Sequence, residues 1–140
     1  MDPYEKGLLK RVPCSKKTNI LSTLVAIMDA EVERRGLKLI PSYTRVLLVN
    51  EIHELIITDE KEAGPGKEVN SIGYLGFMEV KKGGVIAVGD KVSLEGKIIG
   101  KIAGFDETHI PNHQNIIIKS ERKITGAGLN ARLGDKIVIG

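Results

Sequence analysis

The feature that most constrains this chain is the succession of glycine-containing turns and short Ile/Val runs in its C-terminal half. Most of its 16 glycines lie between Gly64 and Gly134. Glycine supplies the positive φ angles of tight turns, and β-branched residues favour pleated, half-buried surfaces. The apolar runs predict strands at residues 72–80, 85–88, 91–95, 97–104, 115–120 and 136–139. Short strands separated by turns about every ten residues are typical of a small barrel or sandwich.

Residues 19–35 carry a different pattern, which predicts the single long helix of the chain. Apolar side chains such as Ile20 and Leu24 fall on one side at 100° per residue, as in an amphipathic helix. Asn19 suits an N-cap and Gly36 a C-terminal stop. The expected fold is therefore mainly β: a small β-barrel with one N-terminal amphipathic helix packed against it.

Two further segments complete the pattern. Residues 43–58 are rich in Val, Ile and Leu and predict one long strand, or two short strands with a bend at Asn50 and Glu51. Residues 59–71 are polar and contain Gly-Pro-Gly, which predicts a loop.

The length of 140 residues fits one domain, which we place at residues 18–140 after a basic N-terminal arm at residues 1–17. The arm carries a net charge of +3, equal to that of the whole chain, so the remainder is neutral. Such an arm could contact nucleic acid or another polyanion. Base-stacking aromatics are scarce in it, which favours a solvated tail and argues against nucleic acid as a partner.

The single cysteine, Cys14, rules out a disulfide framework and fits a reducing compartment. The sequence has no apolar run of about 20 residues and no apolar core of a secretory signal in residues 1–17. We therefore expect a cytoplasmic protein without a membrane partner. A protein partner or a homo-oligomer is left open.

The densest group of polar residues is the segment 105–115, FDETHIPNHQN. The strands on either side of it should be neighbours, so the segment should project as a loop from one end of the barrel. One interpretation is a divalent metal site, with zinc or another transition metal held by Asp106, His109 and His113. The alternative is a polar loop whose side chains brace their own backbone or recognise a ligand. The candidate binding residues are then Glu107, Asn112, Gln114 and Asn115.

His53 lies in the strand-like run 43–58. If that strand alternates, His53 shares a face with Glu51 and Leu55, opposite Glu54. A carboxylate beside the imidazole could hold one ring nitrogen and leave the other for proton transfer or nucleophilic attack. The alternative is a half-exposed histidine with a structural role on a sheet.

The run GGVIAVGDKVSLEGKIIGKIAGFDETHIPNHQNIIIKS, within residues 83–140, resembles the glucitol/sorbitol-specific IIA component of the bacterial phosphotransferase system. It shares the layout of a glycine-led turn, a strand, a second hairpin, a polar loop and an apolar strand. The resemblance implies a compact β-barrel that carries a phosphoryl group on a histidine, with His53 as the candidate carrier.

The sequence contains no phosphate-binding G-x-x-x-x-G-K-[ST], no H-E-x-x-H, no C-x-x-C and no G-x-S-x-G motif. The leading hypothesis for function is therefore a non-catalytic β-barrel binding module that uses the 105–115 loop. The alternatives are a phosphohistidine carrier and a metal-dependent enzyme with a His/Asp loop site.

Overall fold

The computed structural model describes residues 14–140, and this part of the chain consists of β-strands and connecting loops without a helix. The strands are β1 (Ile20–Ile27), β2 (Glu31–Val32), β3 (Leu37–Lys38), β4 (Thr44–Leu47), β5 (Ile52–Thr58), β6 (Glu68–Val69), β7 (Ile72–Lys82), β8 (Gly84–Ala87), β9 (Lys91–Leu94), β10 (Lys97–Asp106), β11 (Asn115–Lys119) and β12 (Lys136–Ile139). The predicted small β-barrel is confirmed.

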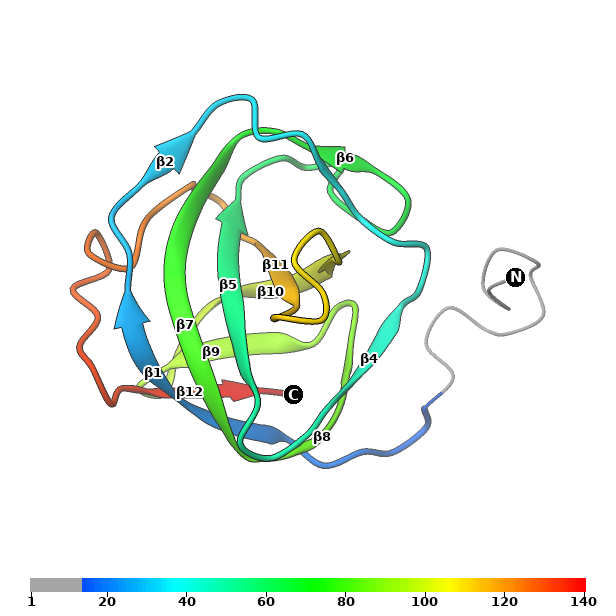
Figure 1. Cartoon of the computed structure of the whole chain (residues 1–140), viewed down its shortest axis with the longest axis vertical. Coiled ribbons are helices and arrows are strands. Elements are labelled where there is room, and N and C mark those ends of the chain that lie inside the picture. The colour runs from blue at the N-terminus through cyan, green and yellow to red at the C-terminus, as the bar shows by residue number, and fades with distance from the viewer. Residues whose placement is uncertain (1–13) are drawn as a thin grey trace.

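Seven strands form a closed ring in the order β1-β12-β9-β10-β11-β5-β7, and β7 pairs back onto β1. Figure 1 shows β5 and β7 crossing the front of this barrel, with β9, β10 and β12 behind them. Neighbours in the ring are antiparallel except β5 and β11, which run parallel. Closure gives every strand of the ring a partner on both sides, so no long edge is left to pair with another chain.

The parallel pair determines which residues meet at one end of the barrel. Because β5 and β11 run in the same direction, their first residues lie at the same end. β10 is antiparallel to β11, so the last residue of β10 reaches that end as well. The polar segment 105–115 connects β10 to β11 there. We call this end of the barrel the mouth.

The barrel interior is filled by aliphatic side chains and one aromatic ring. Leu55 and Ile57 of β5, Ile116 of β11 and Phe105 of β10 are fully buried in this cluster. They alternate with residues that point outward, as a strand with one face on the core requires. The interior is therefore a packed core that gives the mouth a rigid base.

A second apolar cluster lies on the outer face of the same wall. Ile56 and Ile117 point outward from β5 and β11, and Leu37 and Val69 of the small β3–β6 sheet cover them. These two barrel strands are thus buried on both faces. This burial explains their continuous apolar runs, Leu-Ile-Ile in β5 and Ile-Ile-Ile in β11.

The helix predicted for residues 19–35 is wrong, because this segment forms β1 and β2. In β1, Ile20 and Leu24 are buried whereas Leu21 and Val25 are more than 40% exposed, which is the two-residue period of a strand. The run is also rich in β-branched residues, which fit a pleated surface better than a helix. Pairing with β7 and β12 therefore overrides the helical spacing of its apolar residues.

Most other sequence predictions of strands are confirmed. The segment 43–58 forms two strands, β4 and β5, with Asn50 in the left-handed region at φ 74° between them. The six predicted strands between residues 72 and 139 correspond to β7–β12. Of the predicted arm, residues 1–13 lie outside the described part of the chain. Residues 14–140 contain no helix that could cross a membrane.

Candidate functional site

Polar residues replace the apolar core at the mouth because three strand ends meet there in register. Asp106 of β10 lies opposite Asn115 of β11, and Asn115 lies opposite Glu54 of β5. One step further into the barrel, the matching residues are buried and apolar. These three strands are therefore polar at the mouth and apolar one residue further in.

Strand alternation divides these polar residues between two faces. Glu54 and Asn115 each lie two residues before an outward residue, Ile56 or Ile117, so their side chains also point outward. His53 lies two residues before the inward Leu55. Its side chain therefore points inward and faces the opening of the barrel. The site accordingly has an outer cluster on the barrel wall and a mouth cluster at the opening.

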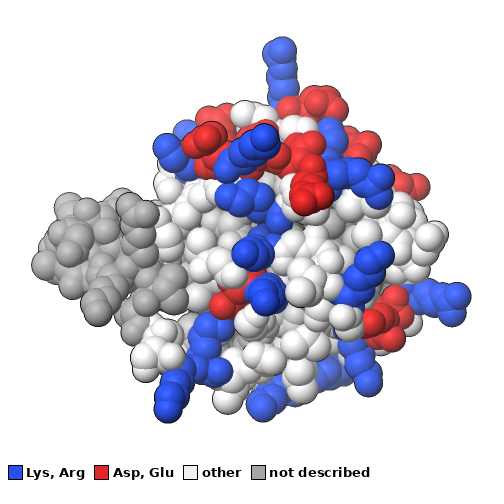
Figure 2. Space-filling view, turned by 180° about the vertical axis from the view of Figure 1, so that it is seen from behind, with Lys and Arg blue, Asp and Glu red and all other residues white. Residues whose placement is uncertain are grey.

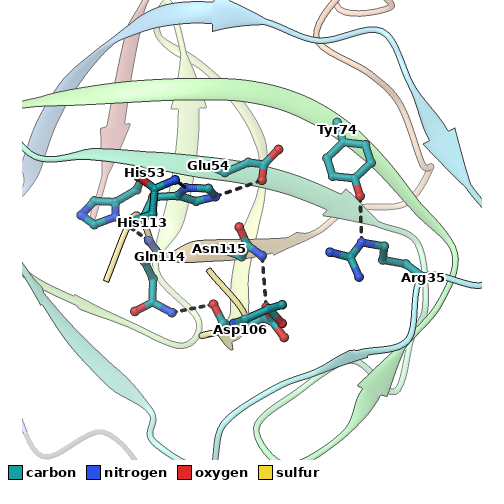
Figure 3. Close-up of polar contacts among 10 residues, drawn as sticks. Arg35, His53, Glu54, Tyr74, Asp106, His113, Gln114 and Asn115 are labelled. Carbon is teal, nitrogen blue, oxygen red and sulfur yellow. Dashed lines mark hydrogen bonds and ion pairs between the residues drawn. The ribbon is translucent and has the colours of Figure 1, made fainter. Parts of the chain in front are cut away.

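The outer cluster joins Glu54 to two imidazoles. Nε2 of His113 lies 3.4 Å from Oε1 of Glu54, within ion-pair range but without hydrogen-bond geometry (Figure 3). The His113 ring packs edge-on against Phe77 and lies 5.1 Å from the ring of His109, centre to centre. Burial raises the pKa of Glu54 above its ordinary value of 4.5, and the His113 charge opposes this rise. Glu54 is thus a buried carboxyl group held beside an imidazole.

A second pair of residues belongs to the same outer face. Nε of Arg35 donates a hydrogen bond of 2.9 Å to the hydroxyl of Tyr74. Figure 3 shows this pair beside the carboxylate of Glu54. The positive charge of Arg35 acts in the same direction as that of His113, toward a lower pKa of Glu54.

Asp106 braces the loop that follows it. Its Oδ1 accepts hydrogen bonds of 3.0 Å from Nδ2 of Asn115 and from the amide of Thr108. Nε2 of Gln114 donates to the backbone carbonyl of Asp106 at 2.9 Å (Figure 3). A carboxylate that accepts from the backbone two residues later is typical of a turn.

The mouth cluster centres on His53, which is 7% exposed. Nδ1 of its ring accepts a hydrogen bond of 3.0 Å from the amide of Gln114, and Nε2 lies 3.2 Å from Oε1 of Glu51. A carboxylate beside the imidazole, one of the two interpretations of the sequence, is present as that of Glu51. Partial burial of Glu51 opposes its ionisation, but hydrogen bonds from the Leu48 amide and from His53 lower its pKa below the ordinary value. The imidazole is therefore held as the tautomer with its proton on Nε2.

A pocket of about 360 Å³ opens at the mouth next to His53. Its walls come from β4, from the start of β5 and from the 105–115 loop. The lining residues are Thr44, Arg45, Val46, Leu47, Glu51, His53, Glu107, Ile110 and Gln114. An ion pair between Nη2 of Arg45 and Oε2 of Glu107 connects β4 to the loop. The loop, β4 and the start of β5 thus surround one polar opening.

The metal triad predicted from the sequence is not assembled. His109 and His113 lie side by side, but the carboxylate of Asp106 is engaged by Asn115 and by the amide of Thr108. Within residues 14–140, no group of three His, Cys, Asp or Glu side chains is placed to hold a metal ion. The loop turns Asp106 toward its own backbone, as the alternative interpretation of this segment required.

The four predicted binding residues divide between the two clusters. Glu107 and Gln114 line the mouth pocket. Asn115 is buried beside Asp106, and Nδ2 of the exposed Asn112 lies 3.3 Å from Nδ1 of His113. Of the four, therefore, only Glu107 and Gln114 face the mouth pocket.

Sequence reasoning missed Arg35, Arg45 and Tyr74. Arg45 reaches the pocket because the β4–β8 pair lies beside the mouth, and Arg35 reaches Tyr74 across 39 residues of chain. No local pattern marks either arginine. Both placements depend on how distant segments pack.

Taken together, a closed seven-stranded barrel and one polar mouth define a small all-β domain with a pre-formed pocket. The chain belongs to DUF6917, a family of unknown function whose model matches residues 14–140. That range includes every strand of the barrel. Comparison with curated proteins and with solved structures found no significant match. The resemblance to the glucitol/sorbitol IIA component stays a prediction.

Proposed function

We propose that this domain is a non-catalytic binding module that holds a small polar molecule in the mouth pocket. The observation that carries the proposal is the pocket itself, about 360 Å³ in volume and lined by charged, polar and apolar side chains. Small-molecule sites in proteins commonly enclose about 300–1,000 Å³. The barrel supplies a rigid base, and the 105–115 loop supplies polar groups, which is a common division of roles in binding sites.

The state of His53 favours recognition over catalysis. Both ring nitrogens have partners, since Nδ1 accepts from the Gln114 amide and Nε2 faces Glu51. A general base or nucleophile needs a nitrogen within reach of the substrate. An imidazole held on both sides is instead a fixed wall of the pocket.

The charges of the pocket indicate the class of ligand. Arg45 already pairs with Glu107, so an acidic ligand would have to replace that carboxylate. Glu51 keeps a low pKa and a partly exposed carboxylate, which accepts hydrogen bonds but donates none. Neutral or cationic molecules with several hydroxyl or amino groups therefore match the pocket better than anions do. Val46 and Ile110 add an apolar rim for a carbon skeleton.

A titration followed by ¹H–¹⁵N NMR tests the proposal. The probes are hexoses, hexitols, amino acids and polyamines, added singly to the full chain. A ligand should shift the amides of residues 44–53 and 105–115 and leave the opposite end of the barrel unchanged. Failure of all four classes to shift these amides would contradict the proposal.

A blocking variant with a matched control sharpens this test. Ile110→Trp places a larger ring at the rim of the pocket, where the native side chain is 47% exposed, so the fold should tolerate it. Binding should weaken at least about tenfold, which corresponds to 1.4 kcal/mol. Ile98→Trp, at a position 57% exposed and away from this pocket, should bind like the native chain. Equal affinity of the two variants would place the ligand elsewhere.

A second candidate function is phosphoryl transfer through His53, as the resemblance of residues 83–140 implies. The observation that favours it is the contact of Glu51 with Nε2 of His53 at the edge of the pocket. Glu51 is 39% exposed at its side chain and can move away to let Nε2 face a phosphoryl donor. Before it moves away, the carboxylate would take the proton from Nε2; Nε2 would then form the N–P bond as the P–O bond of the donor breaks and the electron pair leaves with the donor oxygen.

Incubation with phosphoenolpyruvate and the general phosphotransferase components tests this candidate. A carrier should gain acid-labile phosphate that disappears in His53→Ala and persists in His109→Ala. A wild-type chain without label, under conditions in which a known carrier is labelled, excludes the function.

A further inference from the structure

The surface opposite the front wall of Figure 1 carries a line of basic side chains. Figure 2 shows Lys and Arg following one another down the middle of this rear face, with acidic groups among them at the upper end and beside them near the centre. β9, β10 and β11 form the wall on this side (Figure 1).

Three lysines lie in one cross-strand row. Lys101 of β10 is the register partner of Lys91 on β9 and of Lys119 on β11. Lys91 and Lys101 are exposed and Lys119 is half-buried. Neighbouring strands are about 4.8 Å apart, so the row spans roughly 10 Å of backbone. We call these three residues the lysine row.

No carboxylate within residues 14–140 forms an ion pair with the lysine row. Asp90, next to Lys91 in the sequence, is engaged by Lys17 and by the amide of Ala87. Nζ of Lys119 donates to the carbonyl oxygens of Lys61 and Ala63. Within residues 14–140 the row is therefore not paired directly with a carboxylate.

Folding stability does not account for this arrangement. Like charges directly opposite each other on neighbouring strands destabilise a sheet. A neutral polar residue at position 91 or 101 would pair as well without that repulsion. Repulsion within the row thus lowers the stability of the sheet. A bound external anion would offset this repulsion.

The row borders a groove of about 650 Å³ on the same wall. Lys61, Lys101 and Lys119 line it, together with Asp59 and Glu121. Ile98 is the exposed large apolar side chain in this groove. A membrane-binding face needs several apolar side chains around its lysines, so a polar polyanion fits this wall better than a lipid surface does.

We infer that the lysine row is a docking surface for the phosphate backbone of double-stranded nucleic acid. A duplex presents one negative charge per about 1.7 Å of its axis, so the 10 Å row faces roughly six phosphate charges. Lysine side chains contact phosphates without reading bases, which makes the contact independent of sequence. The scarcity of aromatics argues against stacked single strands, but it does not affect backbone contacts. This surface is separate from the mouth pocket, so neither proposal depends on the other.

Fluorescence anisotropy with a labelled 20-base-pair DNA duplex and the full chain tests the inference. Binding should be weak, with a Kd of about 10⁻⁴–10⁻⁶ M, and should fall steeply with salt. Each lysine that contacts a phosphate adds about 0.9 to the negative slope of log K against log salt concentration. The double variant Lys91→Gln and Lys101→Gln should therefore lower the magnitude of this slope by about 1.8.

The control is Lys81→Gln on β7, a strand of the front wall, at an exposed position. It removes one positive charge elsewhere, and residues 1–13 are the same in every variant. An unchanged slope in the control, together with the loss in the double variant, supports the inference. An equal slope in all three chains, or no binding of the wild type, overturns it. Binding to phosphatidylserine vesicles but not to the duplex also overturns it, in favour of a membrane surface.

Discussion

Glu54 shows how a single residue acquires an unusual environment in this fold. Its side chain points outward from the barrel wall but is buried, and His113 is its ion-pair neighbour. Burial disfavours the charged form, so its pKa rises, whereas the nearby imidazole charge works in the opposite direction. A group of this kind links protonation to folding stability.

The pH dependence of stability should report on Glu54. Because its pKa is higher in the folded than in the unfolded chain, the folded state binds its proton more tightly. Its contribution to stability is therefore present below pH 4.5 and is lost as pH rises through the folded pKa. Glu54→Gln cannot ionise, so the free energy of unfolding of the wild type should fall relative to this variant as pH rises from 4 to 7. Urea denaturation at each pH measures the difference.

Glu121→Gln is the control variant for the Glu54→Gln measurement. Glu121 is exposed, so its variant should follow the wild type across the same pH range within about 0.5 kcal/mol. A difference between wild type and Glu54→Gln that stays constant with pH would show that burial does not perturb Glu54.

At the scale of elements, closure of the barrel depends on the close approach of β1 and β7. Gly76 of β7 has a φ of +154° and lies opposite Ile27, next to a bulge in β1. A Cβ atom added at Gly76 would lie 2.0 Å from the carbonyl oxygen of Ala26. Backbone atoms block this position, so no side-chain rotation can make room.

Gly76→Ala should therefore destabilise the domain by about 3 kcal/mol, from overpacking together with backbone strain. Gly89→Ala is the matched control, because Gly89 also has a positive φ, +94°, but has open space around its Cβ position. It should cost about 1 kcal/mol. Urea denaturation of the two variants gives the comparison. Similar losses would mean that the β1–β7 contact can widen at little cost.

At the scale of the whole molecule, the barrel depends on its last strand. β12 pairs with both β1 and β9, and Ile137 and Ile139 are fully buried. Removal of residues 136–140 should open the ring and expose part of the core. We expect this truncated chain to lose its cooperative unfolding transition, as followed by far-UV circular dichroism.

Deletion of residues 1–12 is the control for the removal of residues 136–140. All strands of the barrel lie between residues 20 and 139, so the shortened chain should keep a cooperative transition and dispersed NMR signals. A retained transition after removal of β12 would indicate that six strands suffice. A lost transition after removal of residues 1–12 would give the N-terminal segment a structural role.

The sequence by itself determined the strands of the C-terminal half, the barrel class and the position of the polar loop between β10 and β11. These features depend on neighbours within a few residues, because alternation and turn chemistry are local properties of the chain.

Only the tertiary structure decided that residues 20–27 form a strand, since their apolar spacing also fits a helix. It also decided the parallel pairing of β5 with β11, which brings His113 to Glu54, and the register that aligns the lysine row. These contacts join segments up to about 60 residues apart in the chain. Their choice depends on how all seven strands bury their apolar faces at once, and no local window of sequence contains that information.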